Sequence, residues 1–325
     1  MRVLVTGGAG YIGSVIAAAL LQRGHAVVVY DDLSRGHRAA VPPGATLVVG
    51  DIRDPGLLAE VLRDERLEAV VHMAALAEVA ESVAHPDRYH DVNVEGTRAL
   101  LAAARACGVR RLVFSSTAAV YGAPERTPIA EDDPLRPTNP YGETKLAGER
   151  LLWEAAERDG LAAVALRYFN ACGADGERGE DHRPESHLVP LALRAARDGT
   201  PLRVYGTDYP TPDGTCVRDY VHVADLAAAH VAALERLPQA AGVCNLGTGR
   251  GDSVSRVLDA VEAATGRRLR REPAGRRPGD PPVLVASNRR AARVLGWRPR
   301  RTLDDAVRDA WRWLQDHPQG YVEAP

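Results

Sequence analysis

The sequence has few cysteines, and their spacing argues against both a disulfide framework and a cysteine-based metal site. The four cysteines are Cys107, Cys172, Cys216 and Cys244. They stand far apart, form no CxxC pair and have no histidine near them at metal-ligand spacing. We therefore expect reduced, structural cysteines and no bound metal ion.

Long apolar runs and a charge excess of either sign are also missing. No segment approaches the roughly 18 apolar residues of a membrane span. The start, MRVLVTGG, lacks the charged residues and apolar stretch of a secretion signal. The 41 basic residues nearly balance the 43 acidic ones, which argues against a nucleic-acid-binding surface. We expect a cytoplasmic protein that binds neither membranes nor nucleic acids.

The first half of the chain alternates short β-branched runs with alanine-rich helical stretches. This alternation is typical of a parallel sheet with helices on both faces. A long helix is predicted to begin near Asn139 and Pro140, because asparagine can cap a helix and proline fits its first turn. The predicted strands span residues 2–6, 26–30, 46–49, 69–73, 111–115 and 162–167.

A glycine-rich turn, TGGAGYIG, follows the first predicted strand and precedes a helix-forming segment. Its Gly7, Gly10 and Gly13 would let backbone amides approach a pyrophosphate, whose charge the start of the helix stabilises. An ordinary tight turn is the alternative. Asp31 and Asp32, at the end of the second strand, favour a dinucleotide site instead. A carboxylate there can bind ribose hydroxyls and would repel the extra phosphate of NADP, so the sequence predicts NAD.

The sequence therefore predicts an α/β fold, a Rossmann-type doubly wound parallel sheet with a smaller C-terminal substrate-binding lobe. Residues 1–169 form the predicted NAD-binding domain, and residues 222–247 are expected to return to it as a helix and a strand. Residues 170–221 and 248–325 form the predicted lobe, because glycine, proline and charged residues interrupt regular structure after residue 169.

Asp51 follows the third predicted strand in the segment VVGDIRD. Its carboxylate, with the neighbouring Ile52, could meet the adenine of a dinucleotide. A helix N-cap is the alternative role for Asp51, and the sequence leaves both open.

Three residues form a candidate catalytic set. Tyr141 and Lys145 are four residues apart and share one face of the predicted long helix. Tyrosine acts as a base near neutral pH only if nearby positive charge stabilises its phenolate, which Lys145 and a nicotinamide ring would supply. Thr117 leaves the carboxyl end of a strand, where such sheets bind ligands, and its hydroxyl could share a proton with Tyr141.

Taken singly, each of these residues is also common on protein surfaces. The composition favours the catalytic interpretation, because Lys145 is the single lysine and the other 40 basic residues are arginine. A merely solvated cation would be expected to be arginine in such a chain. An ammonium and a guanidinium are not interchangeable in a site of this kind.

With TGGAGYIG, Asp31, FSSTAAVYG and YGETK, the chain resembles the extended short-chain dehydrogenase/reductase family, and within it the UDP-glucose (UDP-galactose) 4-epimerases. The resemblance covers essentially the whole chain. It extends to the later segments RYFNACGA, HLVPLAL, YGTDYPTPDGTCVRDYVHVADLA, NLGTG, RRPGD and HPQGY.

The resemblance implies two groups of binding residues around the catalytic set. The cofactor would contact Gly7, Gly10, Tyr11, Ile12, Gly13, Asp31, Asp51, Ile52, Ala74, Ala75, Asn93, Lys145 and Tyr168. The UDP-sugar would contact Thr117, Tyr141, Asn170, His187, Leu188, Tyr205, Arg218, Arg277, Asp280 and Leu284. The two arginines would counter the charge of the diphosphate.

The reaction that the resemblance implies is NAD-dependent 4-epimerisation. Tyr141 takes the C4 hydroxyl proton, hydride passes to NAD, the 4-keto sugar turns over, and hydride returns to its other face. The resemblance also implies a homodimer that forms through residues 89–107 and 140–157.

Two positions depart from the family pattern. Many relatives carry a larger polar residue at Ala77, and bacterial members often place a pocket-limiting tyrosine at Leu284. Because of Leu284, UDP-N-acetylhexosamines, UDP-pentoses and UDP-uronic acids are alternatives to UDP-glucose and UDP-galactose.

Two rival functions remain for the same scaffold. A sugar-nucleotide dehydratase needs an acid pair beside the threonine, whereas Ala118 and Ala119 follow Thr117 and cannot transfer protons. A non-catalytic NAD-responsive protein would tolerate loss of the catalytic set, and all three of its residues are present.

Overall fold

A seven-stranded parallel sheet forms the centre of the computed structural model, which describes residues 1–277 and 279–322. Its strand order is β11-β6-β5-β4-β1-β2-β3, and each neighbouring pair is parallel. This is the doubly wound arrangement that the sequence predicts. The strands are β1 (Arg2–Thr6), β2 (Ala26–Asp31), β3 (Thr46–Val49), β4 (Ala69–His72), β5 (Arg111–Thr117), β6 (Ala162–Tyr168) and β11 (Gly242–Leu246).

The central strands are buried on both faces, which explains why they read as continuous apolar runs in the sequence. The structure extends three strands beyond their predicted ends, and β2 continues to Asp31. β5 and β6 continue to Thr117 and Tyr168, because those two residues are paired with each other across the sheet. β4 ends at His72, one residue earlier than predicted.

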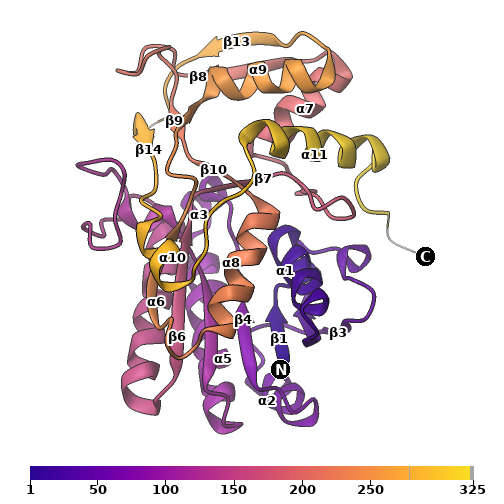
Figure 1. Ribbon diagram of the computed structural model, residues 1–325, viewed down its shortest axis with the longest axis vertical. Coiled ribbons are helices and arrows are strands. Elements are labelled where there is room, and N and C mark those ends of the chain that lie inside the picture. The colour runs from indigo at the N-terminus through magenta and orange to yellow at the C-terminus, as the bar shows by residue number, and fades with distance from the viewer. Residues whose placement is uncertain (278, 323–325) are drawn as a thin grey trace.

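Helices cover both faces of the sheet (Figure 1). On one face, α1 (Tyr11–Gln22) and α8 (Val223–Glu235) pack their apolar side chains against β1, β2 and β6. On the other face, α2 (Pro55–Asp64), α5 (Gly96–Ala106) and α6 (Pro140–Asp159) form a second core with the same sheet.

Helix α6 begins where the sequence predicts. The side chain of Asn139 accepts a hydrogen bond of 2.9 Å from the Gly142 amide, and Pro140 occupies the first turn. This capped start fixes the helix that carries Tyr141 and Lys145.

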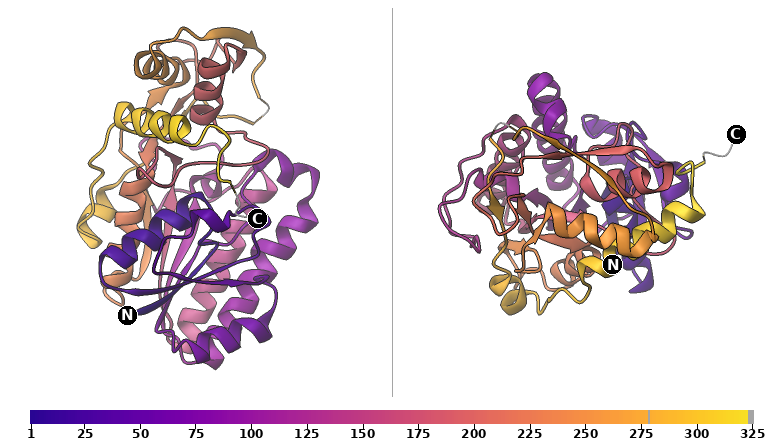
Figure 2. Two further views of the ribbon diagram at one scale, coloured as in Figure 1. Left: turned by 90° about the vertical axis from the view of Figure 1, so that its right-hand side faces the viewer. Right: turned by 90° about the horizontal axis from the view of Figure 1, so that it is seen from above.

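A smaller lobe lies at one end of the sheet, above the strands in Figure 1 and also visible in both views of Figure 2. Its core is formed by α7 (Leu188–Asp198), α9 (Val254–Thr265) and α11 (Leu303–Asp316). Two parallel strands, β8 (Pro201–Tyr205) and β13 (Arg270–Ala274), complete it.

Shorter elements complete the chain. The strands are β7 (Asn170–Cys172), β9 (Val217–Arg218), β10 (Tyr220–His222), β12 (Asp252–Ser253) and β14 (Val283–Leu284). The helices are α3 (Val79–Ala84), α4 (Pro86–His90), α10 (Arg289–Val294), the 3₁₀ turns η1 (Arg38–Ala40) and η3 (Ala118–Tyr121), and the π-helical turn η2 (Asp91–Glu95). Within the described ranges, no helix combines the length and apolar character needed to cross a membrane.

Candidate active site

A cavity of about 1540 Å³ runs between the carboxyl ends of the sheet strands and the lobe. All three candidate catalytic residues and all predicted substrate-binding residues line it. The predicted cofactor-binding residues that line it are Gly7, Gly10, Tyr11, Ile12, Gly13, Asp31, Ile52, Ala74, Ala75, Lys145 and Tyr168. The fold therefore brings segments from both halves of the chain to one site.

The glycine-rich turn after β1 is packed tightly on its protein side and open on its cavity side. Gly7 has a φ of +68°, and a Cβ there would come within 2.6 Å of the Ala74 nitrogen. A Cβ on Gly13 would lie 2.1 Å from the Gly7 oxygen. At Gly10, by contrast, a Cβ would meet only the Gly7 oxygen, at 3.4 Å. Gly10 thus leaves room beside the start of α1, where a pyrophosphate fits.

The Asp31 carboxylate lies at the end of β2, beside this turn, and is 7% exposed. Its oxygens accept hydrogen bonds of 2.9 Å from the backbone amides of Ala9 and Leu33. Burial raises the pKa of Asp31, and these hydrogen bonds oppose the increase. Because an ionised carboxylate can accept about four hydrogen bonds, Asp31 retains acceptor capacity for ribose hydroxyls.

Two predicted cofactor residues lie outside the cavity lining. Asp51 pairs with Arg53 through a hydrogen bond of 2.9 Å, which lowers the pKa of Asp51. The N-cap of α2 is Asp54, so the alternative capping role for Asp51 is wrong. The side-chain amide of Asn93 instead forms hydrogen bonds of 2.8 and 3.0 Å with the backbone of Leu76, which stabilise the loop after β4. Direct cofactor contacts of Asp51 and Asn93 stay predictions.

Lys145 is buried beneath the cavity, with 4% of its surface exposed. Its Nζ donates a hydrogen bond of 3.0 Å to the carbonyl oxygen of Ser115. Burial lowers the pKa of Lys145 to about 8, although the negative charge of Glu149 opposes this shift. The fold thus places an ammonium group with a lowered pKa on the same helix as Tyr141.

Tyr141 and Thr117 face each other across the cavity wall. Burial raises the pKa of Tyr141 to about 12, and a hydrogen bond with Thr117 opposes this increase. The Thr117 Oγ1 also accepts a hydrogen bond of 3.1 Å from the Ala119 amide, which fixes the side chain at the end of β5. A tyrosine in this state needs added positive charge to accept a proton near neutral pH.

The lobe contributes two arginines to the opposite wall. Arg218 in β9 forms an ion pair with Asp280. The guanidinium of Arg277 lies over the ring of Tyr205, 4.2 Å from its centroid. Leu284 in β14 is half-buried beside them.

A buried ion pair that the sequence motifs did not indicate lies close to the catalytic set. Glu149 binds Arg167 at 2.6 Å, and their side chains are 1% and 3% exposed. Glu149 also accepts a hydrogen bond of 2.5 Å from Ser116. The available signal was the spacing of Glu149, four residues after Lys145 on α6, which places both on one helix face.

The doubly wound sheet, the glycine-rich turn and the Tyr–Lys pair at one cavity define a dinucleotide-binding enzyme of the short-chain dehydrogenase/reductase type. The chain belongs to the NAD dependent epimerase/dehydratase family, whose model matches residues 3–247. This finding confirms the family resemblance predicted from the motifs.

Similar proteins extend this relationship over the whole chain. UDP-glucose 4-epimerase of Streptomyces lividans is 51% identical over 323 residues, which cover 98% of each chain. The structure of UDP-glucose 4-epimerase from Brucella ovis in complex with NAD is 49% identical, with a TM-score of 0.92 over 95% of this chain and 97% of that one. The enzyme from Bifidobacterium longum in complex with NAD⁺ and UDP is 38% identical, with a TM-score of 0.93 over 99% and 100% of the two chains.

Proposed function

We propose that this chain catalyses the NAD-dependent 4-epimerisation of a UDP-sugar, with UDP-glucose and UDP-galactose as the first-choice substrate pair. The main support for this proposal is that one cavity is lined by the glycine-rich turn, by Tyr141, Thr117 and Lys145, and by the arginines of the lobe. Relatives named UDP-glucose 4-epimerase at 51% and 47% identity support the same reaction.

The residues around the glycine-rich turn fit NAD. The open space at Gly10 suits the pyrophosphate, and Asp31 suits the ribose hydroxyls. NAD held there would supply a reversible hydride acceptor for the sugar, so the reaction would involve no net oxidation. The cycle requires NAD to stay on the enzyme between these two transfers.

Tyr141 is the proposed proton acceptor for the C4 hydroxyl group of the sugar. Its raised pKa means that the phenolate needs stabilisation, which the buried ammonium of Lys145 would supply. Thr117, hydrogen-bonded to Tyr141, shares and orients the proton. The resulting 4-keto sugar turns in the cavity before its C4 oxygen takes the proton back.

The lobe residues are proposed to hold the UDP group. Arg218 and Arg277 would counter the two negative charges of the diphosphate. Asp280 holds Arg218 in place, while Arg277 is exposed at the cavity wall over Tyr205. Asn170, His187 and Leu188 line the same part of the cavity.

Leu284 supports a second candidate substrate class. Its side chain lines the sugar end of the proposed site and is shorter than the tyrosine that often stands there in bacterial relatives. The added space favours UDP-N-acetylhexosamines next to UDP-hexoses. One similar structure, at 35% identity, is the UDP-Glc/GlcNAc 4-epimerase of Campylobacter jejuni.

Three further features belong to the proposal. The chain acts as a homodimer through α5, α6 and their preceding turns, within residues 89–107 and 140–157. It works in the cytoplasm. Residues 1–169 and about 222–247 form the NAD-binding domain, and residues 170–221 and 248–325 form the substrate lobe.

The decisive experiment incubates the purified protein separately with UDP-glucose, UDP-N-acetylglucosamine, UDP-xylose and UDP-glucuronic acid. Formation of each 4-epimer is followed by proton NMR, without added cofactor and then with NAD. We expect conversion of UDP-glucose, and the relative rates identify the preferred sugar. No conversion of any sugar, even with NAD, would refute the proposed reaction and favour a binding role.

A further inference from the structure

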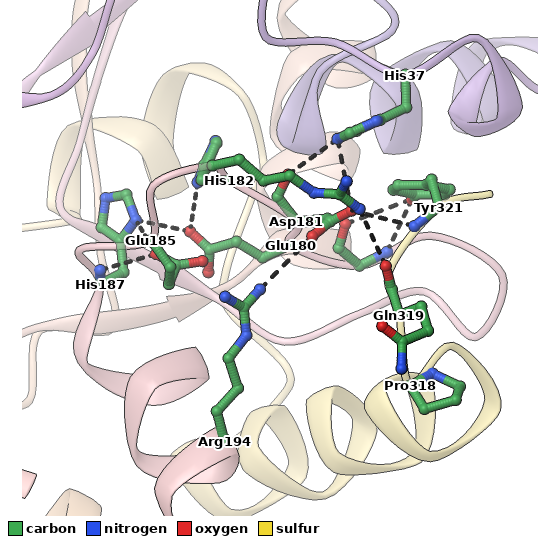
Figure 3. A network of polar contacts seen from close by, with 12 residues as sticks. His37, Glu180, Asp181, His182, Glu185, His187, Arg194, Pro318, Gln319 and Tyr321 are labelled. Carbon is green, nitrogen blue, oxygen red and sulfur yellow. Dashed lines mark hydrogen bonds and ion pairs between the residues drawn. The ribbon is translucent and has the colours of Figure 1, made fainter. Parts of the chain in front are cut away.

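Four side chains with metal-binding chemistry converge in the segment between β7 and α7, as Figure 3 shows. We call Glu180, His182, Glu185 and His187 the 180–187 cluster. One donor atom from each residue lies within 4.8 Å of the others. All four residues also line the wall of the large cavity. The sequence prediction of no bound metal ion was argued from the cysteines alone, and this cluster leads to a different proposal.

Three donor-to-donor distances within the cluster are already close to those of a metal site. Both imidazoles direct Nδ1 toward Glu180 Oε1, at 3.1 Å from His182 and 2.8 Å from His187. His187 Nδ1 lies 3.2 Å from the Oε1 atom of Glu185. In a tetrahedral zinc site with bonds near 2.05 Å, neighbouring donors are about 3.3 Å apart. Small side-chain movements would therefore admit an ion.

One buried carboxylate oxygen of the cluster takes no part in the ion pairs described above. Glu185 has a side chain that is 2% exposed. Its Oε1 accepts hydrogen bonds of 2.8 Å from the amides of Ser186 and His187. Its Oε2 is buried and has no hydrogen-bond partner among the residues that the structure describes. A buried carboxylate oxygen without a partner is costly, and a cation is the ligand that such an atom favours.

The segment does not need the cluster to hold it in place. On its other side, Asp181 accepts a hydrogen bond of 2.9 Å from Arg183, and its carbonyl oxygen lies 2.9 Å from His37 Nε2. Arg183 also donates a hydrogen bond of 2.9 Å to the Gln319 carbonyl oxygen. These contacts anchor the backbone to the sheet domain and to Gln319, so the segment would keep its place if a metal ion replaced the ion pairs within the cluster.

We propose that the 180–187 cluster binds one divalent transition-metal ion in the cavity wall, with Zn²⁺ as the best match to its donors. Two imidazole nitrogens and two carboxylate oxygens are a donor set that suits zinc. Magnesium and calcium favour six or more oxygen ligands and fit this set poorly. The site goes beyond the proposed epimerisation, which uses no metal ion.

The test measures metal binding directly and does not depend on turnover. The full-length protein is stripped with EDTA, dialysed, and titrated with Co²⁺ while its visible absorption is recorded. Zn²⁺ is then added in competition with a chromogenic chelator to measure affinity. We expect one Co²⁺ per chain, with the strong visible bands of a four-coordinate site that Zn²⁺ displaces.

Two substitutions and one matched control locate the ion. Glu185→Gln removes the carboxylate with almost no change in shape, and His182→Gln removes one imidazole. Each should weaken Zn²⁺ binding at least tenfold. His85→Gln removes an exposed histidine outside the cavity lining and should bind like the wild type. The proposal is overturned if the wild type binds neither ion, or if both cluster variants bind as tightly as the control.

Discussion

Burial of the single lysine in the active site has a stability cost that a substitution can expose. Lys145 is 4% exposed, and its pKa is lowered from the ordinary value of 10.5 to about 8. A shift of about 2.5 units corresponds to about 3 kcal/mol of lost stability while the folded lysine is charged. Because the group is almost fully buried, solvent screening reduces this figure little.

The direction of the pKa shift of Lys145 determines the pH range over which its burial lowers stability. Below about pH 8 the lysine is charged in both the folded and the unfolded chain, so the full cost is present. Between about pH 8 and 10.5 the folded protein releases the proton while the unfolded chain keeps it. The free energy of unfolding contributed by Lys145 therefore rises with pH across this range.

Lys145→Met removes the charge and keeps most of the side-chain volume. At pH 7 the variant should gain about 3 kcal/mol and lose about 1 kcal/mol with the hydrogen bond to Ser115, a net gain of about 2 kcal/mol. At pH 10.5 the gain of about 3 kcal/mol should disappear, because wild-type Lys145 is then neutral in the folded state, and the variant should be about 1 kcal/mol less stable than the wild type. The variant should also lose turnover, since the proposed support for the Tyr141 phenolate is gone.

The assay is urea unfolding of NAD-free wild type and variant at pH 7 and at pH 10.5, followed by circular dichroism. Other titrating groups cancel in the difference between the two proteins. Lys145→Arg keeps a permanent charge and serves as the control, with no gain in stability at pH 7. An unchanged difference between wild type and Lys145→Met across this pH range would refute the assigned burial cost.

Three further substitutions test other parts of the site. Tyr141→Phe should lower turnover by about 10²-fold or more while NAD binding, measured by cofactor fluorescence, persists; near-normal turnover would contradict its role as proton acceptor. Gly10→Val should weaken NAD binding with little change in Tm, because only the Gly7 oxygen lies near the added Cβ; unaltered NAD affinity would place the pyrophosphate elsewhere. Glu149→Gln should lower the free energy of unfolding by about 3–5 kcal/mol, because Arg167 loses its buried partner; urea unfolding within 1 kcal/mol of the wild type would show that the pair contributes little.

The sheet was predictable from the sequence because its central strands are buried on both faces. Runs such as those of β1 and β2 are apolar without alternation, and each is bounded by glycine or acidic residues. The ends of the strands were less predictable than their central residues. β5 runs on to Thr117 because Tyr168 pairs with it from β6, and such a partner is invisible to a local pattern.

The site residues that were predicted belong to local sequence patterns, whereas those that were missed come together only in the folded chain. The glycine-rich turn and the Tyr141–Lys145 pair are local patterns, so their chemistry can be read from a few neighbouring residues. Glu149 and Arg167 come together across α6 and β6, and the burial of their charges depends on both cores. Asp51 is predicted to contact the cofactor because it follows a strand, and the fold adds a hydrogen bond from Arg53, two residues later, that the motif did not indicate.

The lobe shows why the roles of individual arginines depend on the folded structure. The motifs predicted Arg218 and Asp280 as separate substrate contacts, yet the structure pairs them with each other. Asp280 therefore already neutralises part of the charge on Arg218 and fixes its direction. Arg277 instead stacks on the neutral ring of Tyr205, so its full positive charge is available at the cavity wall. It follows that Arg277 should contribute more of the attraction for a diphosphate, and Arg218 more of its orientation.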